Sequence, residues 1–181
     1  VDSGIDATHP KIGRIAGGVE LCMGPNGQVV QGLDRFDRAG HGTACAGIIR
    51  RKAPEVDLYS IRIFGESLSA DGRGLVAAIR WATAKGMDVV NLSLGTTEVS
   101  FRDAIAEACS EAVKEGVILV SAEHNDGLES YPACLTEVIG VTGGRAYGRY
   151  GYSYRPGEMI ECVARGDEQR VCWSEGREIM M

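Results

Sequence analysis

The chain has 181 residues, of which 44% are hydrophobic and 24% are charged, and it contains 25 glycines. This length suits one domain with a substantial core, and the composition is typical of a globular protein rich in turns. The formal net charge of −6 and the absence of any run of Lys and Arg exclude a typical nucleic-acid-binding protein. No apolar run approaches the roughly 18 residues that a membrane helix needs, so we expect no membrane partner.

Neither the two ends of the sequence nor its cysteines indicate the cellular compartment of the protein. Val1 leads directly into Asp2-Ser3-Gly4 without a signal peptide or an initiator methionine, and the sequence stops at Met180-Met181 without a turn. We therefore expect residues 1–181 to be one domain truncated at both ends, for which no localisation is predicted. The six cysteines lack the paired spacing of a zinc site, so no metal site is predicted, and their pairing stays open.

The first part of the chain predicts strands around a helix that begins near His41. Residues 1–2 read as the end of a strand that runs into a glycine turn. Short strands are expected at 19–21 and 29–30, a helix at 42–52 that Pro54 ends, and a strand at 56–63.

From Gly74 the apolar residues recur at three- and four-residue steps, which predicts a helix that ends before Gly86. A second helix is expected to start at Ser100, capped by Ser100 and Asp103, and to end at Gly116. Buried strands are predicted at 87–94, 117–122 and 138–141, followed by an irregular stretch and a hairpin near 170–179. Apolar strands that alternate with amphipathic helices predict an α/β fold with a doubly wound parallel sheet and helices on both faces.

Polar residues follow several of these strands, at the sheet edge where α/β proteins bind ligands. Asp2 ends the first strand, Ser93-Leu94-Gly95 ends another, and Glu123-His124-Asn125 follows the strand at 117–122. Right-handed connections would bring His41 to the same edge. A carboxylate, an imidazole and an amide that meet there are suited to acyl transfer.

Each of these residues also has a reading without chemistry. Asp2 can accept hydrogen bonds in a turn, His41 can simply begin a helix, and Asn125 in Asn-Asp-Gly can be a plain turn residue. We expect His9, beside Pro10, to be structural or at the surface.

Four blocks between Val1 and about Gly144 resemble the subtilisin-like serine proteases, the subtilases. They are Asp2-Ser3-Gly4-Ile5-Asp6 with His9-Pro10, Gly40-His41-Gly42-Thr43 with Ala46-Gly47, residues 87–95, and Asn125-Asp126-Gly127 with Tyr131-Pro132-Ala133. The resemblance implies a subtilisin-like fold and a polypeptide substrate. It also implies that Asp2 is the triad aspartate, His41 the general base and Asn125 the oxyanion donor.

The same resemblance implies a cleft for the substrate side chain that precedes the scissile bond. One wall is formed by Ser93, Leu94 and Gly95, and the facing wall and floor by Ser121, Ala122, Glu123, His124 and Ser130. Glu123 and His124 depart from the family, whose members usually carry small residues there. They can narrow the pocket, bias it toward basic substrates, or mark a degenerate cleft.

The resemblance implies no required cofactor. The family often binds calcium, but Asp34, Asp37 and Asp71 are too scattered to be claimed as ligands. Cys45 matches a free cysteine that lies under the histidine in relatives of proteinase K, and we expect a small core residue rather than a reactive thiol.

The family's nucleophile is missing from these residues. No Gly-Thr-Ser or Gly-Asn-Ser step followed by small residues and Pro-His occurs, and neither Ser153 nor Ser174 has suitable neighbours. The tail at 169–179 resembles the hairpin that precedes the serine loop. We therefore expect a serine endopeptidase whose segment 1–181 is inactive alone. The alternative is a pseudoprotease that binds peptides, whereas a nucleotide-binding protein is remote because no phosphate-binding glycine loop occurs.

Overall fold

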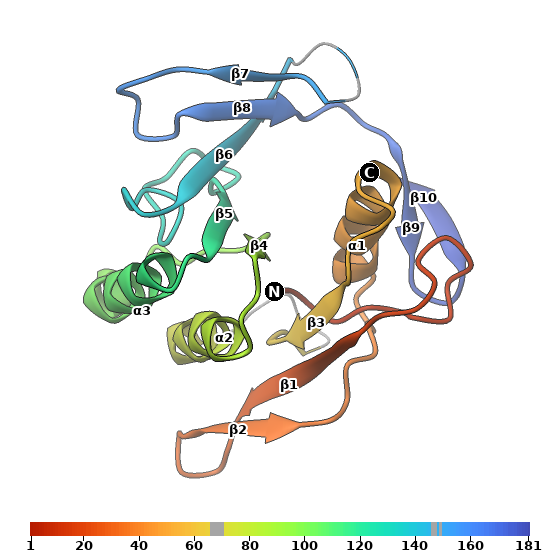
Figure 1. Ribbon diagram of the computed structural model, residues 1–181, viewed down its shortest axis with the longest axis horizontal. Helices are drawn as coiled ribbons and strands as arrows, with labels where there is room; N and C mark the ends of the chain where they lie inside the picture. Colours follow the sequence, from red (N-terminus) through yellow and green to blue (C-terminus); the bar gives the residue numbers. More distant parts are fainter. Residues whose placement is uncertain (66–70, 146–147, 149) are drawn as a thin grey trace. The chain divides into compact units, whose positions relative to one another are not determined.

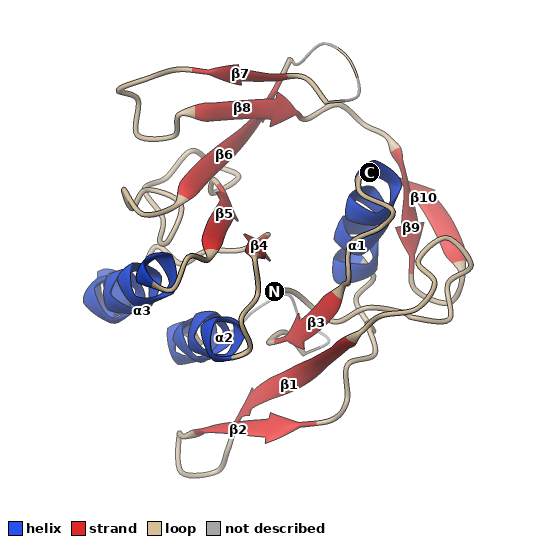
Figure 2. Cartoon of the chain, in the orientation of Figure 1, coloured by secondary structure: helices blue, strands red, loops and turns tan. Residues whose placement is uncertain are grey.

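The computed structural model describes residues 1–65, 71–145, 148 and 150–181. It contains two compact units, the first formed by Val1–Gly74 with Glu168–Met181 and the second by Leu75–Asp167. Figures 1 and 2 show the elements of both, and each unit is described by itself below. Among the described residues, no helix combines the length and the apolar character that crossing a membrane requires.

The first unit contains a three-stranded sheet that positions Asp2. Its central strand β1 (Gly17–Met23) pairs antiparallel with β2 (Val29–Gly32) and parallel with β3 (Tyr59–Arg62). Asp2 lies along the other edge of β3, because its N–H donates to the Ile61 carbonyl at 3.0 Å and its carbonyl accepts from the Ile63 N–H at 2.9 Å. The predicted strands are present, although β3 is shorter than the expected 56–63.

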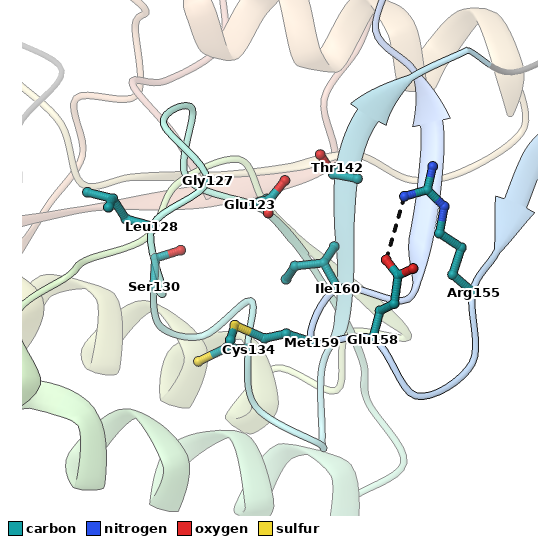
Figure 3. Close-up of a pocket in the computed structure, with 10 residues that line it drawn as sticks. All are labelled: Glu123, Gly127, Leu128, Ser130, Cys134, Thr142, Arg155, Glu158, Met159 and Ile160. Carbon is teal, nitrogen blue, oxygen red and sulfur yellow. Dashed lines mark ion pairs between the residues drawn. The ribbon is translucent and has the colours of Figure 1, made fainter.

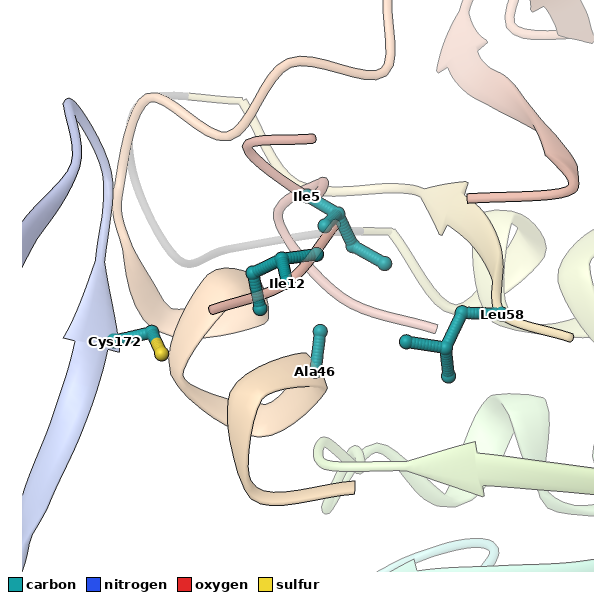
Figure 4. Packing of buried hydrophobic residues seen from close by; sticks show 5 residues of the cluster. All are labelled: Ile5, Ile12, Ala46, Leu58 and Cys172. Atoms are coloured by element: carbon teal, nitrogen blue, oxygen red, sulfur yellow. The ribbon is translucent and has the colours of Figure 1, made fainter. Parts of the chain in front are cut away.

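Helix α1 (His41–Lys52) packs in the same unit against the hairpin of β9 (Arg170–Trp173) and β10 (Arg177–Met180). Both the helix and the hairpin were expected from the sequence. Their shared core is drawn in Figure 4, and it is formed by Ile5, Ile12, Ala46, Leu58 and Cys172. At the end of α1, the Arg50 guanidinium donates to four backbone carbonyls, those of Ile12, Arg14, Pro54 and Val56.

The second unit is built on a five-stranded sheet with the order β4-β5-β6-β8-β7. Strands β4 (Val89–Leu92), β5 (Ile118–Ala122), β6 (Ile139–Gly144) and β8 (Cys162–Arg165) are parallel, and β7 (Tyr152–Tyr154) joins antiparallel at the edge. Helices α2 (Gly72–Ala84) and α3 (Arg102–Lys114) bury their apolar faces, including Ile79 and Ile105, which are fully buried.

Two local predictions in this unit are wrong. A short 3₁₀ helix, η1 (Val99–Phe101), contains Ser100, and α3 begins at Arg102 with no side-chain cap, so the expected Ser100 cap does not form. The stretch expected to be irregular forms β7 and β8, which pair over three residues, so the tail holds two hairpins instead of one (Figure 2). Tyr152 and Tyr154 alternate with Ser153 as in a strand, but the run has three residues, all of them exposed, and is shorter than the about 4–8 residues over which alternation indicates a strand.

Candidate active site

Asp2 and His41 form a direct contact in the first unit. The Nδ1–H of the His41 ring donates to Asp2 Oδ1 at 2.8 Å, with side chains that are 26% and 10% exposed. His41 is the first residue of α1 and Asp2 lies beside β3, so a helix start and a sheet edge fix the pair. The Nε2 atom of His41 has no hydrogen-bond partner among the described residues. In the neutral ring, this orientation leaves Nε2 available to take a proton from a nucleophile.

A second buried carboxylate, Asp37, holds the start of α1 in place. It accepts hydrogen bonds from the Gly40 and Thr43 N–H groups, each at 2.7 Å, and from the Thr43 hydroxyl. The Ser3 hydroxyl donates to Asp37 at 2.8 Å and accepts the Gly42 N–H at 3.0 Å. Ser3 is the neighbour of Asp2, so this network ties both residues of the pair to one another through the backbone. An acidic group at a helix N-terminus is also favoured by the helix dipole.

The pair shifts the pKa values of both partners. The hydrogen bond with Asp2 is the main reason that the pKa of His41 lies above its ordinary 6.5. Burial raises the pKa of Asp2, but the hydrogen bond and the charge of His41 outweigh burial and leave the pKa below its ordinary value. Protonated His41 beside ionised Asp2 is therefore the stabilised state of the pair.

This electrostatic pair predicts a pH-dependent stability of the chain. Because the pKa of His41 is raised in the folded state, the pair contributes to the unfolding free energy. This contribution is complete below the unfolded-state pKa of about 6.5 and is lost as the pH rises through the folded-state pKa. We expect the excess unfolding free energy of the wild type over Asp2→Asn, measured in urea, to be larger at about pH 5.5 than at about pH 9. An excess that stays constant between these pH values would show that the Asp2–His41 pair makes no electrostatic contribution to stability.

Gly42 permits the close approach of α1 to Asp2. A Cβ atom at this position would overlap the Gly4 carbonyl oxygen and lie 3.1 Å from Asp2 Cβ. We expect Gly42→Ala to lower the unfolding free energy by about 1–3 kcal/mol, because the helix start must move. Gly74→Ala, where a Cβ meets nothing within 4 Å, is the control, and we expect it to stabilise the chain by about 0.5–1 kcal/mol. Equal urea midpoints for the two variants would refute this account.

The predicted walls of the substrate cleft lie together in the second unit. The register of β4 and β5 pairs Leu92 with Ser121, so the segments that follow, 93–95 and 122–124, leave the sheet side by side. The Ser121 hydroxyl donates to the Leu94 carbonyl at 3.4 Å. Ser121 is fully buried, and its hydroxyl joins the two segments.

Ser130 lies against the first of these segments. Thr96 and Tyr131 exchange two backbone hydrogen bonds of 2.9 Å, and a Cβ placed on Gly95 would lie 3.5 Å from Ser130 Oγ. The structure therefore brings together, within one unit, the predicted residues Ser93, Leu94, Gly95, Ser121, Ala122, Glu123, His124 and Ser130.

Asn125 occupies an exposed turn that follows β5. The turn is held by the Asp126 N–H, which donates to His124 Nδ1 at 3.2 Å, and by the Gly127 N–H, which donates to the His124 carbonyl at 2.9 Å. In the described part of the chain, the Asn125 side-chain amide has no internal partner. It is therefore free to donate to a ligand. Because Asn125 belongs to the second unit and the Asp2–His41 pair to the first, their predicted convergence stays a prediction.

Cys45 lies near the catalytic candidates instead of in the core. Its Sγ is 4.0 Å from His41 Nδ1, and the residue is half-buried. Within the described ranges, Asp2, His41 and Cys45 form the one group of potential metal ligands, with ligand atoms within 4.8 Å. His41 Nδ1 is already hydrogen-bonded to Asp2, so two of these three residues are the Asp2–His41 pair described above.

Each aspartate considered as a calcium ligand has another partner in the structure. Asp34 pairs with Arg38, Asp71 pairs with Arg73 at 2.8 Å, and Asp37 is enclosed by the helix start. We assign no calcium ligands.

A family model described as the subtilase family matches residues 1–175 of the chain. The chain belongs to the subtilase family. This confirms the resemblance seen in the four sequence blocks.

Individual curated relatives extend the comparison. The chain is 34% identical over 142 residues to the minor extracellular protease Epr of Bacillus subtilis, covering 72% of the chain and 22% of Epr. It is 32% identical over 156 residues to subtilisin DY of Bacillus licheniformis, covering 78% of the chain and 53% of that protein. The chain thus spans about half, or less, of these curated relatives.

Solved structures confirm the fold class. Sphericase covers the whole chain with a TM-score of 0.77 at 23% identity, and the chain covers 69% of it. A cold-adapted subtilisin-like serine proteinase gives the same TM-score at 22% identity, covering 99% of the chain and 66% of the other protein. The predicted α/β, subtilisin-like fold with a parallel sheet is therefore correct.

Sequence reasoning missed the residues that support the pair in this subtilase. Asp37 was considered only as a scattered calcium ligand, because the N-cap of α1 is Gly40 and Asp37 does not stand at the N-cap position where an aspartate indicates a helix start. Asp6 and His9 are buried and hold the β9–β10 hairpin. Asp6 accepts the Glu175 N–H at 2.9 Å, and the His9 ring donates to the Arg177 carbonyl at 2.9 Å. The structural reading of His9 is thus correct.

Proposed function

We propose that the protein containing this chain is a serine endopeptidase that hydrolyses polypeptides through an Asp-His-Ser triad. The observation that carries the proposal is the 2.8 Å hydrogen bond between His41 Nδ1 and Asp2 Oδ1 in a member of the subtilase family. The serine is expected outside residues 1–181, and a form that includes it is called the extended form below.

In this mechanism, Asp2 holds the His41 ring with Nε2 directed away from the carboxylate. His41 Nε2 takes the proton of the serine hydroxyl as the serine oxygen attacks the peptide carbonyl, and Asn125 donates to the developing oxyanion. His41 then returns the proton to the leaving amine, which produces an acyl-enzyme. Water hydrolyses the acyl-enzyme by the same proton transfers in reverse order.

The walls formed by 93–95 and 121–124, with Ser130, would bind the substrate residue that precedes the scissile bond. This proposal is supported by the register of β4 with β5 and by the short distance between Gly95 and Ser130. We propose no cofactor for the reaction, because a serine, an imidazole, a carboxylate and an amide supply every proton transfer and the oxyanion contact.

Replacement of Asn125 tests the oxyanion role. In subtilisin, loss of the corresponding donor lowers kcat by about 10²–10³, and we expect Asn125→Ala to lower kcat of the extended form by a similar factor with little change in KM. Peptide-anilide hydrolysis measures both constants. Segment 1–181 alone should release no product, and an Asn125→Ala variant with wild-type kcat would remove Asn125 from the mechanism.

A second candidate function is a peptide-binding module without turnover. Glu123 and His124, which stand where subtilases usually carry small residues, favour this alternative. It predicts that the extended form binds peptides and releases no product, so the same assay separates the two functions.

A further inference from the structure

A cavity of about 350 Å³ lies inside the second unit. Figure 3 shows it between the connection that follows β5 and the connection between β7 and β8. Glu123, Leu128 and Ser130 line it from the first connection, Thr142 from β6, and Ile160 from the second connection. This volume suits a single large side chain or a small organic cation.

The carboxylate of Glu123 is the unpaired charge of this cavity. The backbone of Glu123 is fixed, because its N–H donates to the Val141 carbonyl at 2.8 Å. Its half-buried side chain makes no hydrogen bond or ion pair with any residue that the structure describes. The other charged residues of the lining, Arg155 and Glu158, pair with one another at 3.5 Å. The lining therefore carries a net charge of −1, located at Glu123.

The remainder of the lining is suited to an alkyl chain. Leu128 and Ile160 supply apolar surface, and the Ser130 and Thr142 side chains add hydroxyl groups. A long basic side chain places its methylene groups on apolar surface and its charge next to a carboxylate. A half-buried carboxylate without a partner also gains most from a cationic ligand, because the ligand offsets the cost of its partial desolvation.

We propose that Glu123 makes this cavity selective for a basic side chain, Arg or Lys, of a polypeptide substrate. That the ligand is part of a substrate rests on the proposed function. That the ligand is a cation rests on the cavity alone. It identifies Glu123 as the residue that sets specificity at the wall formed by residues 121–124. The sequence left three interpretations of Glu123 open: a narrowed pocket, a bias toward basic substrates and a degenerate cleft. The cavity favours the bias toward basic substrates.

The test measures the binding of p-aminobenzamidine to the chain, with the fluorescence of this probe as the readout. Glu123→Gln keeps the shape of the side chain and removes its charge, and we expect it to raise the Kd at least about tenfold, or about 1.4 kcal/mol. Glu115→Gln, an exposed position after α3 in the same unit, makes the same change in net charge and should leave the Kd unchanged. Circular dichroism verifies the folding of each variant.

Equal Kd values for the wild type and Glu123→Gln would overturn the inference. Peptides that differ only in the residue before the scissile bond provide the second arm, with the extended form as enzyme. Equal kcat/KM for Arg and Leu would also overturn the inference, while the protease function would stand. Glu123-dependent binding of the probe without any peptide cleavage would support the cation site and contradict the protease function.

Discussion

Replacing His41 by alanine is expected to abolish peptide hydrolysis by the extended form. In subtilisin, a member of the same family, loss of the catalytic histidine lowers kcat by about 2 × 10⁶, and we adopt that magnitude from it. The reason is that, in the proposed mechanism, His41 Nε2 takes the proton of the serine, since Nδ1 is bonded to Asp2. The residual rate should approach the level that substrate binding and the oxyanion donor sustain alone.

The control for this variant is Glu55→Gln, which changes an exposed side chain just beyond α1. It should leave kcat within experimental error, whereas His41→Ala should retain KM within a few-fold and lose kcat. Peptide-anilide hydrolysis at saturating substrate measures this difference. A His41→Ala variant that retains even a hundredth of wild-type kcat would show that another group acts as the base.

Replacing Asp2 by asparagine is expected to lower kcat by about 3 × 10⁴, the size of the corresponding effect in subtilisin. The amide lacks the negative charge that stabilises the protonated ring, and it can impose the wrong tautomer on the imidazole. Because the hydrogen bond with Asp2 raises the pKa of His41, the substitution should also lower that pKa. The acid limb of the kcat/KM profile should therefore move to lower pH in the variant.

A merely structural role for Asp2 gives a different result. It would lower the unfolding free energy and the amount of active enzyme, but leave the acid limb in place. Profiles of kcat/KM against pH, normalised to the concentration of active sites, separate the two roles. An unchanged acid limb in Asp2→Asn would mean that Asp2 does not set the protonation of His41.

Much of the fold follows from local sequence patterns. The Gly40-His41-Gly42 start and Pro54 bound α1 closely, and Gly86 and Gly116 mark the ends of α2 and α3 because both adopt positive φ angles. The candidate residues Asp2 and His41 were identified because they stand in ordered family blocks. Their direct contact agrees with the role assigned to each.

Other features depend on contacts between distant residues. β8 owes its place to parallel pairing with β6, and no pattern within residues 162–165 indicates that pairing. Asp37 bonds to Ser3, 34 residues away, so its role is invisible in its own neighbourhood. The Ser100 cap fails for a local reason, because the chain there forms a 3₁₀ turn before α3 begins.

The central claim is that Asp2 and His41 activate a serine for attack on a carbonyl. Labelling of the extended form with a fluorophosphonate, read by mass spectrometry, tests it most directly. We expect one covalent adduct on a serine beyond residue 181 and no adduct in His41→Ala. An extended form that stays unlabelled, or one that labels equally with and without His41, would contradict it.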